Sequence, residues 1–101
     1  MVRRRARHRL SKRAAADVAR VAHYTIEQFG VEQARRYRDG LDTCFQRLAE
    51  NAELGRTAGQ LAPNLRRFEY QSHVVFYMPD EGGILIVRVL HERMDVQAHL
   101  W

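Results

Sequence analysis

Ionisable side chains gather near the C-terminus at residues 91–95, which read His-Glu-Arg-Met-Asp and directly follow an apolar run. Functional residues are common where a strand ends and a loop begins. A histidine beside an arginine could transfer a proton and stabilise a phosphate during RNA cleavage, so His91 and Arg93 are candidates for that chemistry. His73 and Tyr77 could join such a site if the strand register brings them close. A solvated strand end followed by a turn explains residues 91–95 equally well.

Arg88 lies inside the apolar run 84–90 and is its only charged residue. A charge within a buried strand is costly unless it is paired or lies at an opening. Arg88 either forms a structural ion pair, with an acid such as Glu69 or Asp95, or presents its guanidinium to a phosphate or carboxylate of a ligand. We favour the ion pair, although the sequence does not separate the two.

Arginine and aromatic residues alternate over residues 66–70, a pattern that also occurs on nucleic-acid-binding surfaces. Successive side chains of a strand point to opposite faces. Core packing of Phe68 and Tyr70, with Arg67 and Glu69 on the exposed face, therefore gives the same pattern. We favour the core for the two aromatic residues.

The composition is that of one folded domain. Of 101 residues, 46% are apolar and 29% are charged, and residues 1–101 are expected to form a single domain with a small core. The net charge is +5, and every basic residue except Lys12 is an arginine. Arginine binds phosphate and carboxylate groups through a planar fork, which favours an anionic partner. A GC-rich genome would produce the same arginine bias.

No metal site and no cofactor is predicted. The histidines have no spacing typical of zinc ligands, and no glycine-rich phosphate loop leads into a helix. The single cysteine, Cys44, falls on an apolar helix face and is expected in the core. No apolar run approaches the roughly 20 residues that span a bilayer, and the basic N-terminus lacks the apolar segment of a signal peptide. We expect a cytoplasmic protein without membrane contact.

Two amphipathic helices are predicted between residues 11 and 50. Ser11 suits the N-cap of the first helix, and Gly30 suits its end. Glu32 then lies in the first turn of the second helix, where the helix dipole favours an acid. So short a link requires an antiparallel hairpin with both apolar faces against one core. The apolar residues recur at spacings of three and four, at Ala15, Val18, Ala22, Ile26 and Phe29 and then at Ala34, Tyr37, Leu41, Cys44, Phe45 and Leu48.

Four strands are predicted around this hairpin. Residues 5–10 alternate weakly and suit a short edge strand with one basic face. Periodicity fades in a loop at 51–63, and the remaining strands form an antiparallel meander with short turns at 71–72 and 79–83. The predicted fold is α+β: an N-terminal strand, an antiparallel helix hairpin and a three-stranded meander. Its three runs are 65–70, 73–78 and 84–90, the last apolar on both faces and so the most buried.

The chain resembles the RelE/ParE superfamily of toxins, and within it the ParE branch. The order of elements matches the fold of that superfamily, and the matching phrases cover most of residues 5–100. They are LSKRA at 10–14, LAENAELGR at 48–56, LRRF at 65–68, SHVVFY at 72–77 and RVLHERMD at 88–95.

The resemblance implies the toxin of a type II toxin–antitoxin module, which arrests growth by binding DNA gyrase and so serves functions such as plasmid stabilisation. It implies a ParD-like antitoxin whose acidic C-terminal segment covers the helix hairpin and the sheet, and contact with operator DNA only through that antitoxin. The attraction between an acidic segment and this +5 chain would speed their encounter. The residues expected to contact the antitoxin are Val18, Ala22, Tyr37, Leu41, Phe68 and Tyr70.

Two alternatives remain. The RelE branch cleaves messenger RNA on the ribosome with several lysines and arginines and a C-terminal tyrosine or comparable group, whereas this chain has no lysine after Lys12 and no tyrosine after Tyr77. A degenerate toxin that only binds its antitoxin, as a non-toxic co-repressor, is the second alternative. A ribonuclease site would consist of Arg67, Arg88, His91 and Arg93.

For target binding we select Arg88, His91 and Arg93, with Asp95 orienting an arginine. Trp101 ends the chain and could pack on the sheet or anchor a partner, and we favour packing.

Overall fold

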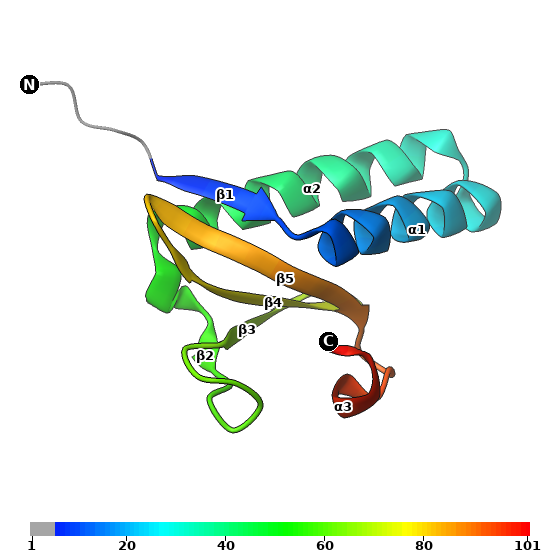
Figure 1. Cartoon of the computed structure of the whole chain (residues 1–101). Helices are drawn as coiled ribbons and strands as arrows, with labels where there is room; N and C mark the ends of the chain where they lie inside the picture. The colour runs from blue at the N-terminus through cyan, green and yellow to red at the C-terminus, as the bar shows by residue number, and fades with distance from the viewer. Residues whose placement is uncertain (1–5) are drawn as a thin grey trace, which may run out of the picture.

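The computed structural model describes residues 6–101 and has an α+β fold in which two long helices cover one face of a five-stranded sheet (Figure 1). The strand order is β1-β5-β4-β3-β2. The elements are β1 (Arg7–Leu10), α1 (Lys12–Phe29), α2 (Val31–Glu50), the 3-10 turn η1 (Ala52–Leu54), β2 (Arg56–Thr57), β3 (Arg66–Tyr70), β4 (His73–Asp80), β5 (Gly83–His91) and α3 (Val96–His99).

The helix hairpin is confirmed. The hydroxyl of Ser11 accepts a hydrogen bond from the amide of Ala14 at 3.0 Å and so caps α1. Gly30 stands alone between the two helices with φ of 89°, a value that a side chain disfavours, and α2 starts at the next residue. The helices therefore lie antiparallel on the sheet.

The predicted apolar face of α1 is wrong in part. Ala14, Asp17, Val18 and Thr25 are the buried positions, whereas Ala15, Ile26 and Phe29 are exposed. The C-terminal end of α1 extends beyond the strands in Figure 1, and Ile26 and Phe29 near that end stay exposed. The predicted face of α2 is confirmed: Tyr37 is half-buried and its five other members, Cys44 among them, are buried.

The antiparallel meander of β3, β4 and β5 is confirmed, and β1 lies parallel to β5 as an edge strand. Arg5, the first residue of the predicted strand, lies outside the described residues. The predicted turn at 79–83 is too long, because β4 continues through Pro79 to Asp80. Pro79 fits there because the pairing of β3 with β4 stops at Tyr77, so no strand on that side needs its missing N–H.

Three short elements were not predicted: η1, β2 and α3. Within the predicted loop, β2 pairs with β3. The hydroxyl of Tyr77 fixes the start of this loop, since it donates to the carbonyl of Ala52 and accepts from the amide of Gly55, both at 2.8 Å. None of these three elements shows a periodic pattern in the sequence, because each spans only two to four residues.

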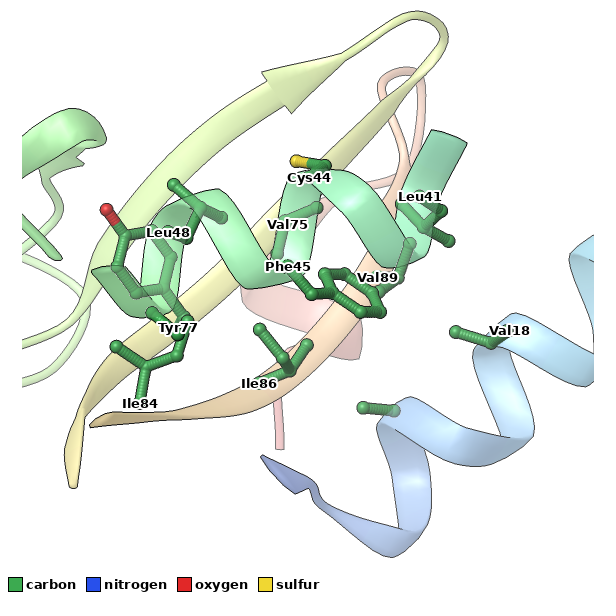
Figure 2. Packing of buried hydrophobic residues seen from close by; sticks show 12 residues of the cluster. Val18, Leu41, Cys44, Phe45, Leu48, Val75, Tyr77, Ile84, Ile86 and Val89 are labelled. Atoms are coloured by element: carbon green, nitrogen blue, oxygen red, sulfur yellow. The ribbon is translucent and has the colours of Figure 1, made fainter. Parts of the chain in front are cut away.

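The core has two parts, one on each face of the sheet. The first lies beneath the helices, where Phe45 and Leu48 of α2 pack on Val75, Tyr77 and Ile86 (Figure 2). The second lies on the other face and is covered by the loop before β3 and by the C-terminal segment; it includes Leu65, Phe76, Leu90 and Leu100. Most of β5 is buried, as predicted. The favoured packing of Trp101 is wrong: Leu100 is buried, and Trp101 is 61% exposed.

Candidate functional site

Arg88 on β5 forms a buried, two-point ion pair with Asp17 on α1. Nε of Arg88 lies 2.7 Å from Oδ2 of Asp17, and Nη2 lies 2.9 Å from Oδ1. Both side chains are more than 90% buried. The expected ion pair is therefore present, but the suggested partners were wrong, because Glu69 bonds Arg56 at 2.7 Å and Asp95 caps α3.

The same carboxylate also serves the sheet and the surface. Asp17 accepts from the amide of Val89 at 3.0 Å and from Nη2 of Arg20 at 2.8 Å. Burial acts to raise the pKa of Asp17, but the hydrogen bonds from Arg88 and Val89 outweigh it and hold the pKa below its ordinary value. Asp17 is thus a charged residue that links α1 to the edge of β5.

The sequence carried a signal for Asp17 that we missed. Asp17 is an acid between Ala14 and Val18 on the buried face of α1, and Arg88 is the sole charge in an apolar strand. Two opposite charges, each isolated on an apolar face, are best satisfied by each other.

Arg88 also holds the C-terminal segment, since its Nη1 donates to the carbonyl oxygen of His99. One guanidinium therefore joins α1, β5 and the C-terminal end of α3. All three guanidinium nitrogens of Arg88 are bonded within the chain, so its role is structural. Its burial does not fit the direct contact with a target for which it was a candidate.

A largely apolar groove of about 270 Å³ lies beside this ion pair, between α1 and the end of β5. Its lining is Asp17, Arg20, Val21, Tyr24, His73, Val89, Leu90, His91 and Met94. Sequence reasoning missed the contribution of α1, because Val21 and Tyr24 lie outside the apolar pattern assigned to that helix.

His73 and His91 meet at the inner wall of the groove, as the register His73↔His91 requires. Their rings contact edge to face with centroids 5.4 Å apart, and the hydroxyl of Tyr37 lies 2.5 Å from Nδ1 of His73. Burial, helped by His91, lowers the pKa of His73, which favours the neutral ring as a partner for that hydroxyl. Tyr77, the other residue suggested for this site, points instead into the helix-side core.

Residues 91–95 form a hydrogen-bonded turn at the exposed end of β5. Nδ1 of His91 accepts from the amide of Arg93 at 3.1 Å, and its carbonyl accepts from the amide of Met94 at 2.9 Å. Arg93 is exposed and His91 is half-buried. The expectation that Asp95 orients an arginine is wrong: its carboxylate accepts from the amide of Gln97 at 3.1 Å.

The four residues named for a ribonuclease are not assembled as expected. Arg67 and Arg88 flank Phe76 in register, and the guanidinium of Arg67 lies over the Phe76 ring at 5.5 Å. The Nε of Arg67 is buried and has no hydrogen-bond partner within residues 6–101. Arg88 turns away to Asp17. Only His91 and Arg93 stay together at a surface.

The residues expected to contact an antitoxin belong mainly to the core. Val18 and Leu41 are 3% and 1% exposed, which contradicts their selection as surface residues. Tyr37, Phe68 and Tyr70 pack against the same cluster and, like Ala22, are half-buried. The apolar faces of the hairpin are filled by the sheet of the same chain.

Within residues 6–101, no three His, Cys, Asp or Glu side chains gather closely enough to hold a metal ion. Nor is any described helix long and apolar enough to cross a bilayer.

Comparisons with known proteins agree on one family. The family model described as "ParE toxin of type II toxin-antitoxin system, parDE" matches residues 8–96. The chain is 38% identical over 95 residues to Toxin ParE1 of Mycobacterium tuberculosis, covering 93% of this chain and 97% of that protein. It is 39% identical over 93 residues to Toxin ParE1 of Caulobacter vibrioides (92% and 96% covered) and 36% identical over 92 residues to Toxin ParE of Escherichia coli (90% and 89% covered).

A solved structure of the chromosomal ParDE TA system from P. aeruginosa shares the fold. It aligns with a TM-score of 0.73 and 17% identity, covering 86% of this chain and 96% of that one. The family model and the curated relatives show that this chain belongs to the ParE toxin family of type II toxin–antitoxin systems.

Proposed function

We propose that this ParE-family toxin arrests growth by binding DNA gyrase and blocking replication, and that a ParD-like antitoxin neutralises it. The relatives named Toxin ParE support the toxin role, and the shared fold with a chain of a ParDE system supports a ParD-like partner. In this proposal the chain is cytoplasmic, like gyrase, and reaches operator DNA only through its antitoxin.

The ion pair between Arg88 and Asp17 is the observation that carries the choice of a binder over a ribonuclease. A ribonuclease needs free cationic groups around the scissile phosphate. Arg88 offers no free nitrogen, because two donate to Asp17 and the third to the carbonyl of His99. Without Arg88, the four residues named for a ribonuclease site reduce to three. Of these, Arg67 lies on a separate part of the sheet, and only His91 and Arg93 lie together.

The surface proposed to engage gyrase is the turn after β5, with Arg93 as its exposed cation and His91 beside it. Arg88 would act from beneath, since it positions β5 and the C-terminal segment that flank this turn. Asp95 supports the same region by capping α3.

Pulse labelling after induction of the toxin alone tests the proposal. We expect DNA synthesis to fall first, and the purified toxin to inhibit supercoiling by gyrase. An earlier fall in protein synthesis would replace the proposal with ribosome-dependent RNA cleavage. If cells that accumulate the folded chain grow normally, the remaining hypothesis is a non-toxic co-repressor.

A further inference from the structure

We propose that the edge of β5 beyond the end of β1 is a strand-addition site for an extended, acidic segment of the antitoxin. The inference rests on the proposed neutralisation by an antitoxin and specifies how that partner binds.

The edge is left open because β1 is shorter than β5. Pairing of the two strands ends at Leu10↔Ile86, whereas β5 continues to His91. Side chains take over the next edge groups: the Ser11 hydroxyl donates to the carbonyl of Val87, and Asp17 accepts from the amide of Val89. Beyond Val89 no strand or side chain of residues 6–101 takes their place.

The hydrogen bond of the Val89 amide shows which backbone groups at the end of β5 point to the open edge. Its amide points to Asp17, so it faces away from β4, and the pair Val75↔Val89 is therefore of the non-hydrogen-bonded kind. The pair His73↔His91, two residues further on, is of the same kind. The carbonyl of Val89 and the amide of His91 thus both point to the open edge. Neither has a partner among the described residues, although the His91 carbonyl accepts from Met94.

The groove supplies walls for such a strand. Val21 and Tyr24 of α1 stand on one side and Met94 on the other, around a space of about 270 Å³. Tyr24 is 60% exposed and Met94 is 37% exposed, so both have apolar surface to bury. An extended peptide would bond the edge through its backbone and place alternate side chains in this groove.

The net charge of +5 of the chain, and the exposed Arg20 at the rim of the groove, favour an acidic partner. Asp17 is one carboxylate bound to two guanidinium groups, Arg88 and Arg20, which leaves one positive charge in excess. Arg20 presents that charge to solvent, with 68% of its side chain exposed. On the turn after β5, Arg93 is a second exposed cation, and its neighbour Glu92 is an exposed acid.

Such a strand would lie directly beside residues 91–95, the surface proposed to engage gyrase. The antitoxin would then neutralise the toxin by occupying that edge and covering the turn.

Amide hydrogen exchange of the toxin, free and bound to its purified antitoxin, tests the site. We expect the His91 amide to exchange at least about 100-fold more slowly in the complex, because it gains a backbone hydrogen bond, while the exposed Gly59 amide is unchanged. Binding with an unprotected His91 amide would overturn strand addition but leave neutralisation intact. Failure of the antitoxin to bind at all would overturn both.

Affinity measurements on two charge variants provide an independent test. Val21→Glu places a carboxylate against the incoming strand and should weaken antitoxin binding about 30-fold. Ala19→Glu is the control. It adds the same charge to α1 at an exposed position two residues before Val21, and should change antitoxin affinity less than about two-fold. Equal affinities for the two variants, both folded as judged by circular dichroism, would refute the site.

Discussion

The carboxylate of Asp17 on α1 holds the guanidinium of Arg88 on β5 through two hydrogen bonds, across a separation of 71 residues in the chain. The pair occupies one position on the edge of β5 past the end of β1, since Asp17 also accepts from the amide of Val89. It reaches the C-terminal segment through the bond from Arg88 to the carbonyl of His99. The fold and the candidate binding surface therefore share one buried ion pair.

Asp17→Asn is expected to destabilise the protein by about 3 kcal/mol, because it leaves the Arg88 charge buried without its counter-ion. The side chain keeps its size, so packing is preserved. Equilibrium unfolding in urea measures the loss. Asp42→Asn, which breaks an exposed pair with Arg38, is the matched control and should cost less than about 0.5 kcal/mol. Similar costs for the two variants would mean that the buried pair contributes no more than a surface pair.

His73 should make stability depend on pH in the near-neutral range. Its pKa is lowered, so the unfolded chain binds this proton at a higher pH than the folded chain. The contribution to stability is complete above the ordinary value of 6.5 and is lost as the pH falls from there through the folded pKa. His73→Gln should remove this loss of unfolding free energy as the pH falls below 6.5. A profile that keeps its slope in His73→Gln would assign the effect to another group.

Gly83→Ala is expected to displace β1. A Cβ at residue 83 would lie 1.7 Å from the carbonyl oxygen of Arg7, and neither backbone can move without breaking the parallel pairing. We expect a loss of about 2–4 kcal/mol in unfolding free energy and faster exchange of the β1 amides. Gly40→Ala is the control, because its close contact is the Tyr70 hydroxyl, the end of a side chain that can turn aside. Equal effects of the two changes would contradict this account.

Arg93→Ala should weaken growth arrest about ten-fold, measured as the inducer level that halves growth, because it removes the exposed cation of the proposed target surface. Antitoxin binding should survive with a change below about three-fold, since one rim charge contributes little. Arg35→Ala, which removes an exposed arginine from α2, is the control and should leave growth arrest intact. Undiminished toxicity of Arg93→Ala would move the target surface elsewhere.

The sequence predicted best the elements in which apolar residues recur many times at one spacing. The long helix α2 and the strands of the meander carry enough apolar positions to fix both type and face. The buried face of α1 was assigned wrongly because polar Asp17 and Thr25 occupy it, while apolar Ile26 and Phe29 near the end of the helix are exposed.

The candidate site was predictable only at one end. Residues 91–95 stood out by composition, and the structure does place His91 and Arg93 at an exposed turn. The ion pair of Arg88 was predicted in kind but with the wrong acids, because Asp17 was not recognised as part of the buried face of α1. The open edge of β5 is made of backbone groups, which leave no mark in the residue types.

Removal of Trp101 alone should leave the melting temperature nearly unchanged, because its side chain is 61% exposed. Removal of residues 99–101 should lower it, because Leu100 is buried against Phe76 and Leu90 and the carbonyl of His99 accepts from Arg88. Leu100→Ala removes the packing of Leu100 but keeps the hydrogen bond to the carbonyl of His99. It should lower the free energy of unfolding by about 2–3 kcal/mol through the cavity it leaves. Thermal and urea unfolding of the three variants measure the differences. A loss in the Trp101 deletion as large as that of Leu100→Ala would show that the terminal ring, and not Leu100, closes the outer face of the sheet.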